Sequence, residues 1–126
     1  MKFLIQEQML GKKGEDLAVS LLQNKGYRIL ETNYRIKIGE IDIVAYDDGT
    51  YCFVEVKTRK TKSRGLALES IAAAKQRKLC RVAQWYISSH DLFDAKARFD
   101  VVAIQVERDG SFEVSLIKNA FECPNN

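Results

Sequence analysis

The chain has 126 residues, of which 46% are hydrophobic and 29% are charged, and its formal net charge is +3 at pH 7. This length and apolar content suit one compact domain and exclude a disordered chain. No apolar run approaches the roughly 20 residues that a membrane-spanning helix needs, and residues 1–6 are too short for a signal peptide. We therefore expect a single cytoplasmic domain over residues 1–126, with an N-terminal extension at 1–10 and a polar tail at 118–126.

The three cysteines, Cys52, Cys80 and Cys123, form no C-x-x-C motif and are odd in number. This pattern argues against a disulfide framework and against a zinc site. We expect Cys52 and Cys80, which fall in apolar segments, to be small buried hydrophobic residues. Because His90 is the only histidine, a catalytic histidine pair and a multi-histidine metal site are excluded.

The hydrophobic periodicity predicts a helix, three strands, a second helix and two more strands. In the first helix, Leu17, Ala18, Leu21 and Leu22 recur at helical spacing and stop at Gly26, a natural helix terminator. The strands are expected at residues 27–34, 41–47, 50–58, 99–106 and 112–117, and the second helix at about 68–86. This order, αβββαββ, favours the α/β class, with a central mixed sheet flanked by helices.

The dipeptide Asp48-Gly49, between two runs rich in β-branched and aromatic residues, is a strong signal for a hairpin. A two-residue turn there fixes which side chains oppose one another, and opposed pairs at every second position share one face of the sheet. The pairs on that face are Tyr46 with Tyr51, Val44 with Phe53, Asp42 with Glu55, and Glu40 with Lys57. A three-residue loop with a bulge would instead shift the pairing by one position.

Asp42 opposite Glu55 would bring two carboxylates together, with Cβ atoms about 4.5–5.5 Å apart. Partial burial strengthens the repulsion between two such charges, so either one carboxyl group holds a proton or a cation lies between them. A hard divalent ion such as Mg²⁺, bound by one or two carboxylates, water and substrate phosphate, would resolve the conflict. The alternative is a set of polar pairs on a solvated sheet face.

Residues 39–42 (Gly-Glu-Ile-Asp) and 53–59 (Phe-Val-Glu-Val-Lys-Thr-Arg) resemble the active-site hairpin of the PD-(D/E)XK nuclease superfamily, with an acid on one strand and acid-x-Lys on the next. The sequence is more closely similar to the bacterial YraN-like family, which resembles the archaeal Holliday-junction resolvases. Further residues that fit are Gly14-Glu15-Asp16-x-Ala18, Gly26-Tyr27, Asn33, Lys75 and Arg98-Phe99-Asp100-Val101. The resemblance covers about Gly11 to Val106 and implies a restriction-endonuclease-like core. Ile41 replaces the proline of the superfamily's name, which is widely lost.

The resemblance implies a divalent-metal-dependent endonuclease that cuts nucleic-acid phosphodiesters, with structured or branched DNA as its substrate. By this resemblance Asp42, Glu55 and the backbone carbonyl of Val56 hold Mg²⁺ or Mn²⁺, and Glu15 reaches the ion directly or through water. Lys57 would be the catalytic lysine that orients water or offsets charge on the phosphate. For Glu15 the alternative is an acid favoured by the dipole of its helix.

Lys75 falls in the middle of the apolar stripe of the second predicted helix, so it should face the sheet. There it would contact the scissile phosphate or the carboxylates, and the alternative is that its long side chain extends outward to solvent. Arg98 and Asp100 begin a strand, where a structural role is at least as well supported as a chemical one. For Tyr46, Tyr51 and Trp85, core packing is a better expectation than stacking on bases.

A basic segment follows Lys57 directly. Its cations Arg59, Lys60, Lys62 and Arg64 have no acid among them, and with the mildly basic net charge they predict a loop that grips nucleic-acid phosphates. A solvated loop is the alternative. Two cuts in a symmetric junction would need two sites, which a homodimer would supply. A non-catalytic nucleic-acid-binding module and a protein adaptor remain as competing functions, and DNA and RNA are not distinguished.

Overall fold

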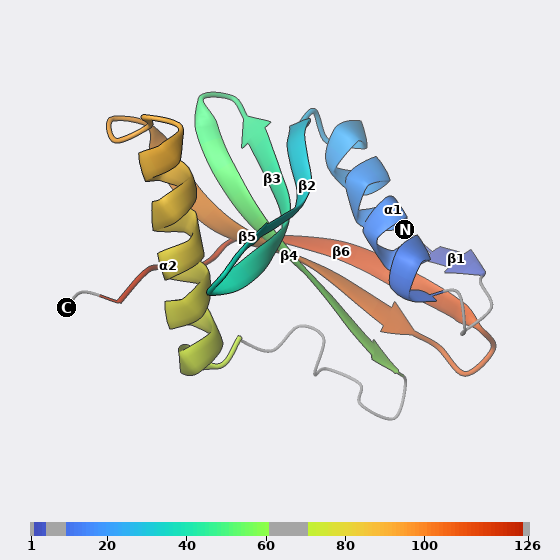
Figure 1. Ribbon diagram of the computed structural model, residues 1–126. Coiled ribbons are helices and arrows are strands. Elements are labelled where there is room, and N and C mark those ends of the chain that lie inside the picture. Colours follow the sequence, from blue (N-terminus) through green and yellow to red (C-terminus); the bar gives the residue numbers. More distant parts are fainter. Residues whose placement is uncertain (1, 5–9, 61–70, 125–126) are drawn as a thin grey trace.

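A six-stranded mixed sheet forms the centre of the structure, a computed structural model that describes residues 2–4, 10–60 and 71–124. The spatial order of the strands is β1-β6-β5-β4-β3-β2 (Figure 1). Only β4 and β5 pair in parallel, and every other neighbouring pair is antiparallel. The elements are β1 (Lys2–Leu4), α1 (Leu10–Asn24), β2 (Arg28–Ile36), β3 (Gly39–Asp47), β4 (Thr50–Lys60), α2 (Ala73–Ser89), β5 (Lys96–Val106) and β6 (Ser111–Phe121). The predicted α/β class and the order αβββαββ are confirmed, with β1 as an addition.

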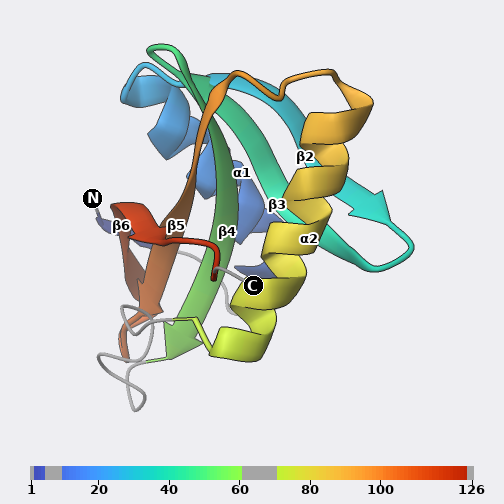
Figure 2. The same ribbon diagram turned by 90° about the vertical axis from the view of Figure 1, so that its left-hand side faces the viewer.

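The two helices cover opposite faces of the sheet, so the core is divided into two layers. Viewed from the side in Figure 2, α2 lies in front of the sheet and α1 behind it. Alternating side chains of the central strands serve the two layers, since Val54 packs with α1 whereas Phe53 packs with α2. In the described part of the chain, neither helix is long and apolar enough to cross a membrane.

The first helix ends where the sequence predicts. Gly26 adopts a φ of 92°, its N–H bonds to the carbonyl of Gln23, and the N–H of Tyr27 bonds to the carbonyl of Leu22. These two bonds form a Schellman motif, in which a residue with left-handed backbone conformation satisfies the last carbonyls of the helix. The turn directs Tyr27 into the protein, where it is buried.

The second helix begins later than predicted. Ile71 and Ala72 precede α2, and Ala72 has an extended backbone with a ψ of 146°. Residue 68, where the helix was expected to begin, lies outside the described residues. Ile71 is nevertheless buried in the layer beneath α2, which explains why its spacing fits the apolar stripe of the helix.

The hairpin between β3 and β4 has the predicted register. Asp48 and Gly49 have φ values of 46° and 90°, as the type I′ turn requires. The paired positions run from Asp47 with Thr50 to Ile43 with Val54, so the alternative bulged loop is wrong. The twofold alternation from this turn places residues 44 and 53 on the face covered by α2.

The ends of the chain differ from expectation. The predicted extension at 1–10 contains β1, which pairs with β6, and the predicted polar tail at 118–126 begins with the last four residues of β6.

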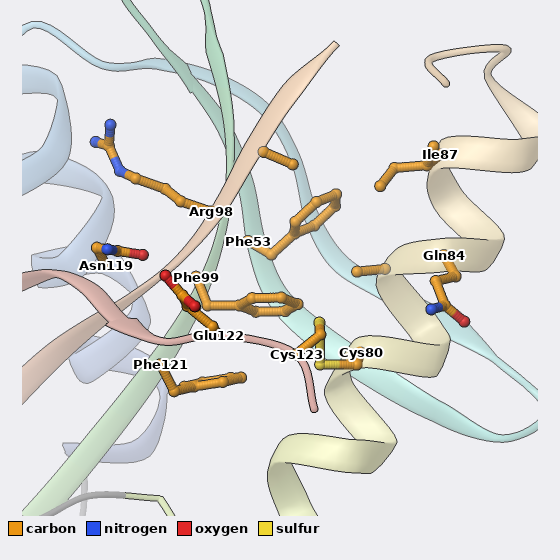
Figure 3. A pocket seen from close by; sticks show the side chains of 12 residues that line it. Phe53, Cys80, Gln84, Ile87, Arg98, Phe99, Asn119, Phe121, Glu122 and Cys123 are labelled. Carbon is orange, nitrogen blue, oxygen red and sulfur yellow. A yellow bond between two sulfur atoms is a disulfide. The ribbon is translucent and has the colours of Figure 1, made fainter. Parts of the chain in front are cut away.

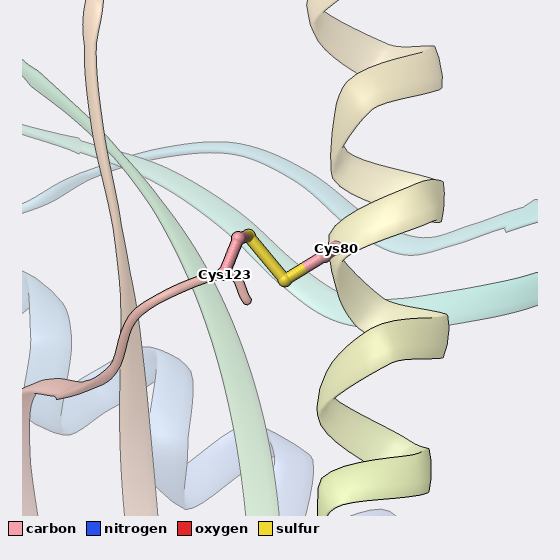
Figure 4. The surroundings of a disulfide bond; sticks show 2 residues. All are labelled: Cys80 and Cys123. Carbon is pink, nitrogen blue, oxygen red and sulfur yellow. A yellow bond between two sulfur atoms is a disulfide. The ribbon is translucent and has the colours of Figure 1, made fainter. Parts of the chain in front are cut away.

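Cys80 of α2 forms a disulfide with Cys123, which follows β6 (Figure 4). The expectation of no disulfide is therefore wrong, because an odd cysteine count does not reveal that a helix and a chain end 43 positions apart meet in space. Cys52 is buried and free, as predicted.

Candidate active site

The site lies where strands β3 and β4 separate. Their backbone pairing stops at Ile43 and Val54, and β3 continues to Gly39 paired only with β2. Two residues beyond Val54, the N–H of Val56 donates a hydrogen bond of 2.8 Å to Oδ2 of Asp42. A side-chain carboxylate thus takes the place of the next backbone acceptor and holds Asp42 against the edge of β4.

Asp42 and Glu55, the carboxylate pair, come together as the register predicts. They lie close enough to share a hydrogen bond, although their positions are not part of the backbone ladder. Burial raises the pKa of Asp42 to about 7, and the hydrogen bond with Glu55 and the negative charge of Glu55 add to the rise. The N–H of Val56 acts in the opposite direction, and the charge of Glu40 adds a smaller increase to this pKa. Near neutral pH the pair therefore binds a proton readily, and a cation could replace that proton.

Lys75 reaches the carboxylate pair from the first turns of α2. Its Nζ lies 3.1 Å from Oε2 of Glu55. The Lys75 side chain is 50% exposed and that of Glu55 is 15% exposed, so the ammonium group bridges solvent and the site. The prediction that Lys75 faces the sheet and contacts the carboxylates is confirmed.

A hollow of about 360 Å³ opens beside the pair, between the end of β4 and the start of α2. Its lining residues are Glu55, Val56, Lys57, Thr58, Arg59, Ile71, Ala72 and Lys75. Two of the predicted catalytic side chains, Lys57 and Lys75, therefore line one hollow with Glu55. The side chain of Lys57 is partly exposed there, and it lies on the same strand face as Glu55.

Two other predicted acids are placed differently. Glu15 of α1 accepts a hydrogen bond of 3.5 Å from Asn33. Within the described residues, no group of three or more His, Cys, Asp or Glu side chains could hold a metal, so the structure does not bring Glu15 to the carboxylate pair. Glu40 bonds to Nε of Arg35 at 2.9 Å, so the expected pairing of Glu40 with Lys57 is wrong. The Glu40–Lys57 pairing assumed that the ladder continued, but β3 and β4 have separated there.

The basic segment is only partly within the described residues. Arg59 lines the hollow, and its Nη1 donates to the carbonyl of Thr58 at 2.9 Å. Lys60 ends β4, whereas Lys62 and Arg64 lie outside the described residues. The expected phosphate-gripping loop remains a prediction for these positions.

A second polar cluster, centred on the fully buried Asp100, is structural. Its carboxylate accepts hydrogen bonds from the hydroxyl of Tyr27 at 2.8 Å, Nε of Arg98 at 3.0 Å and the N–H of Asn119 at 2.9 Å. Arg98 also donates to Asp47 at 2.7 Å. Burial and the neighbouring Asp100 raise the pKa of Tyr27, which keeps its hydroxyl a donor. The cluster joins the end of α1 to β3, β5 and β6, so Arg98 and Asp100 have the structural role that was one of two expectations.

None of the three aromatic residues lies in the core. Tyr46 and Tyr51 are partly exposed and lie outside both core clusters, so the core-packing expectation is wrong for them, and their rings stack edge to face at 5.1 Å. Trp85 is 61% exposed on α2, so the expectation that it packs in the core is wrong. The buried face of α2 includes Val82 and Tyr86, and Trp85 is not among the residues of that face.

A separate apolar hollow of about 310 Å³ lies between α2 and the ends of β5 and β6 (Figure 3). Phe53, Phe99 and Phe121 project into it, and the Cys80–Cys123 disulfide closes one side. Neither Asp42 nor Lys57 lines it, so it is distinct from the hollow beside the carboxylate pair.

Comparison with known proteins assigns this chain to a family. The profile described as "Uncharacterised protein family UPF0102" matches residues 14–104. A UPF0102 protein of Desulfosudis oleivorans is 49% identical over 119 residues, covering 94% of each chain. A UPF0102 protein of Desulforapulum autotrophicum is 44% identical over 117 residues, covering 93% of this chain and 96% of its own.

Among solved structures, Pyrococcus furiosus SfsA in complex with Ca²⁺ is similar, with a TM-score of 0.38 and 11% identity. The alignment covers 94% of this chain but only 66% of SfsA, so the chain spans just under two thirds of that protein's length. This likeness is too low to support an argument about chemistry. The sequence relationships are decisive: this chain belongs to the UPF0102 family, within the restriction-endonuclease-like superfamily that its hairpin motif resembles.

Proposed function

We propose that this protein is a divalent-metal-dependent nuclease that hydrolyses DNA phosphodiesters. The observation that carries the proposal is the carboxylate pair itself. Asp42 and Glu55 lie within hydrogen-bond reach of each other where two strands separate, and burial beside Glu55 raises the pKa of Asp42 to about 7. Membership of the UPF0102 family, with its nuclease-type fold, supports the same reading.

The donor set suits a small, hard divalent cation. Mg²⁺ takes oxygen ligands and is usually held by one or two carboxylates, with water and substrate phosphate filling the other positions. Asp42 and Glu55 would supply the carboxylates, and the backbone carbonyl of Val56 would be a third ligand. When bound, such an ion would lower the pKa of a coordinated water and offset charge on the phosphate. The partial exposure of both carboxylates fits an ion that shares its ligands with solvent and substrate.

The two lysines supply positive charge to the reacting phosphate. Hydrolysis bonds a water oxygen to phosphorus and breaks one ester P–O bond, and the departing oxygen takes a proton. Negative charge grows on the other phosphate oxygens meanwhile, so a fixed ammonium group nearby lowers the barrier. Lys57 and Lys75 line the hollow in which a phosphodiester would lie. Lys75 also neutralises part of the charge of Glu55 at 3.1 Å.

We propose structured or branched DNA as the substrate. Support comes from the basic segment, whose first member Arg59 lines the hollow, and from the sequence resemblance to junction resolvases. Contacts from such cations to the phosphate backbone supply affinity without reading sequence. A homodimer would give the two sites that a symmetric junction needs.

The test is cleavage of labelled single-stranded, duplex, flap and four-way-junction DNA, and of RNA, with Mg²⁺, Mn²⁺ or EDTA. We expect cleavage with a divalent ion, loss of cleavage in EDTA, and loss in Asp42→Asn. Asp48→Asn is the matched control, because it changes a carboxylate of the same hairpin at a turn position whose φ of 46° suits asparagine. No cleavage of any substrate with either ion would contradict the proposal.

A second candidate is a nucleic-acid-binding module without turnover. The observation that favours it is the ion pair between Lys75 and Glu55. This ion pair shows that an ammonium group, and not only a metal ion, can neutralise one of the two carboxylates. This candidate predicts tight binding of the same nucleic acids, with no product in any divalent ion. It also predicts that Asp42→Asn binds nucleic acid as the wild type does and loses no affinity for Mn²⁺.

A further inference from the structure

The outer face of α2, which points away from the sheet, carries cations and an aromatic side chain but no acid. Helix α2 contains no Asp or Glu between Ala73 and Ser89. Arg77, Arg81 and Trp85 follow one another at intervals of four, so they form one stripe along the helix, which we call the outer stripe. All three are exposed. Within the described residues, none of these cations forms an ion pair.

A hollow of about 350 Å³ lies against this stripe. Its walls are Arg77, Arg81 and Gln84 on one side and the chain end at Cys123 and Pro124 on the other. The Cys80–Cys123 disulfide holds the chain end against the helix (Figure 4). Two guanidinium groups and an amide facing one hollow are donors that suit the oxygens of a phosphate. The disulfide thus helps to form a wall of a hollow rich in hydrogen-bond donors.

Trp85 follows this hollow along the helix. Trp85 is 61% exposed, so its indole offers an apolar face on which a base can stack. Phosphate-binding arginines followed by an aromatic face are the combination by which proteins hold single-stranded nucleic acid. A duplex keeps its bases stacked inside, so only an unpaired base can lie flat on Trp85. From Arg77 to Trp85 the helix rises roughly 12 Å, long enough to contact more than one nucleotide of an unpaired strand.

The stripe belongs to the same helix as the proposed active site. Lys75, which contacts Glu55, lies only two residues before Arg77. A strand leaving the hollow beside the carboxylate pair could pass around the first turn of α2 and continue along its outer face. In Figure 1 the segment after β6 passes beside this side of α2, and no labelled helix or strand lies beyond the helix there. A second copy of the chain fits less well, because a twofold contact through the stripe would place cations against cations.

We propose that the outer stripe of α2 binds an unpaired DNA strand leaving the active site, with its phosphates on Arg77 and Arg81 and one base stacked on Trp85. The proposal rests on the nuclease function proposed above and adds the substrate class. The preferred DNA carries a single-stranded segment next to the cut, as a flap, a fork or an opened junction does.

The first test uses Trp85 as its own probe, because it is the only tryptophan in the chain. The full chain in EDTA is titrated with a short oligothymidylate and with a hairpin-capped duplex. We expect the oligothymidylate to quench the fluorescence and the duplex to leave it nearly unchanged. By anisotropy of a labelled oligothymidylate, Trp85→Ala should bind roughly 5- to 100-fold more weakly. Trp85→Phe keeps an aromatic ring and should retain most of the affinity.

The second test counts the phosphate contacts. Each contact to single-stranded DNA contributes about 0.7 to the slope of log K against log salt concentration. The double variant Arg77→Gln/Arg81→Gln should therefore lower the magnitude of that slope by about 1.4. Arg108→Gln is the matched control, since it removes an exposed cation from the turn between β5 and β6. Its slope should equal that of the wild type.

Three results would overturn the inference: no quenching at saturating oligothymidylate, unchanged affinity and salt slope in the stripe variants, or a dimer in sedimentation that Trp85→Ala dissolves. The last result would identify a second copy as the occupant. Because binding is measured in EDTA, stripe-dependent binding without any cleavage would leave this inference standing and contradict the proposed nuclease. Normal cleavage of flap DNA by both stripe variants would support the proposed nuclease and contradict this inference.

Discussion

The carboxyl group of Asp42 is subject to opposing influences. The N–H of Val56 donates to it and favours the charged form, whereas burial and the adjacent Glu55 favour the neutral form. Burial and Glu55 outweigh the hydrogen bond from Val56, so the pKa of Asp42 rises to about 7. A residue in this state is sensitive to any cation that enters the site, because proton and cation compete for the same oxygens.

This balance predicts how stability depends on pH in EDTA. The pKa of Asp42 is about 7 in the folded protein and 3.8 in the reference state, so the folded state holds the proton more tightly. The resulting stabilisation is complete below pH 3.8 and is lost as the pH rises through about 7. We expect the urea midpoint of the wild type to fall between about pH 4 and 7 and to level off above pH 7, and that of Asp42→Asn to fall less over the same range. Equal pH dependence in the two proteins would count against the buried pair.

Lys57 allows a second prediction about a single residue. If its ammonium group offsets charge on the reacting phosphate, Lys57→Ala should lower the single-turnover cleavage rate by about 10²- to 10³-fold. Binding of the DNA should change little, because the loss is confined to the transition state. Lys37→Ala, which removes an exposed lysine from the turn between β2 and β3, is the control and should cleave normally. A loss of binding equal to the loss of rate would indicate that Lys57 only holds the substrate.

At the level of elements, β3 runs unusually close to α2. A Cβ placed on Gly39 would lie 3.1 Å from Cγ2 of Val82 and 3.3 Å from the side chain of Lys78. Glycine therefore allows the β2–β3 hairpin to pack on the helix after β3 has separated from β4. The separation of β3 from β4 also exposes the carboxylate pair. It therefore accounts both for the position of the β2–β3 hairpin and for the opening of the site.

Two glycine-to-alanine substitutions should have opposite effects on stability. Gly39→Ala forces the hairpin away from α2 and should lower the free energy of unfolding by about 1–3 kcal/mol. Gly14→Ala places its Cβ 3.4 Å from Ile104, an ordinary contact, within a helix. It should raise the free energy of unfolding by about 0.5–1 kcal/mol through helix propensity. Urea denaturation measures both, and a destabilised Gly14→Ala together with a neutral Gly39→Ala would contradict the packing described here.

The elements were predictable from sequence to the extent that local signals determine them. Asp48-Gly49 fixes the register of the hairpin, and Gly26 ends α1, because both positions need a positive φ. The start of α2 was misplaced because Ile71 is buried without being helical. The hydrogen bond between Val56 and Asp42 could not be foreseen, since it exists only because two strands separate in the folded sheet. Trp85 was assigned to the core because aromatic residues usually lie there, and the wheel of α2 places it outside.

At the level of the whole molecule, long-range contacts join distant parts of the chain around the hollow between α2, β5 and β6. The cluster around Asp100 joins residues as distant as Tyr27 and Asn119, and the disulfide joins α2 to the segment after β6. Neither contact has a local signature in the sequence. The number and spacing of the cysteines therefore do not reveal the disulfide.

The disulfide should stabilise the protein mainly by restricting the unfolded chain. For a closed loop of this size, the expected contribution is about 2–4 kcal/mol. Reduction of the wild type should lower the urea midpoint to that of Cys123→Ser, and reductant should not change the midpoint of that variant. Cys52→Ala is the control, because Cys52 is free and should leave the effect of reductant intact. A wild type that is indifferent to reductant would contradict this prediction.

Calorimetric titration of Mn²⁺ into the metal-free protein tests the central claim most directly, because it asks whether Asp42 and Glu55 together hold a cation, apart from any catalysis. The wild type and Asp48→Asn should each bind one ion at the site, whereas Asp42→Asn and Glu55→Gln should each weaken binding by at least about tenfold. Equal Mn²⁺ affinity in all four proteins, or no binding by the wild type, would show that the two carboxylates do not form a metal site.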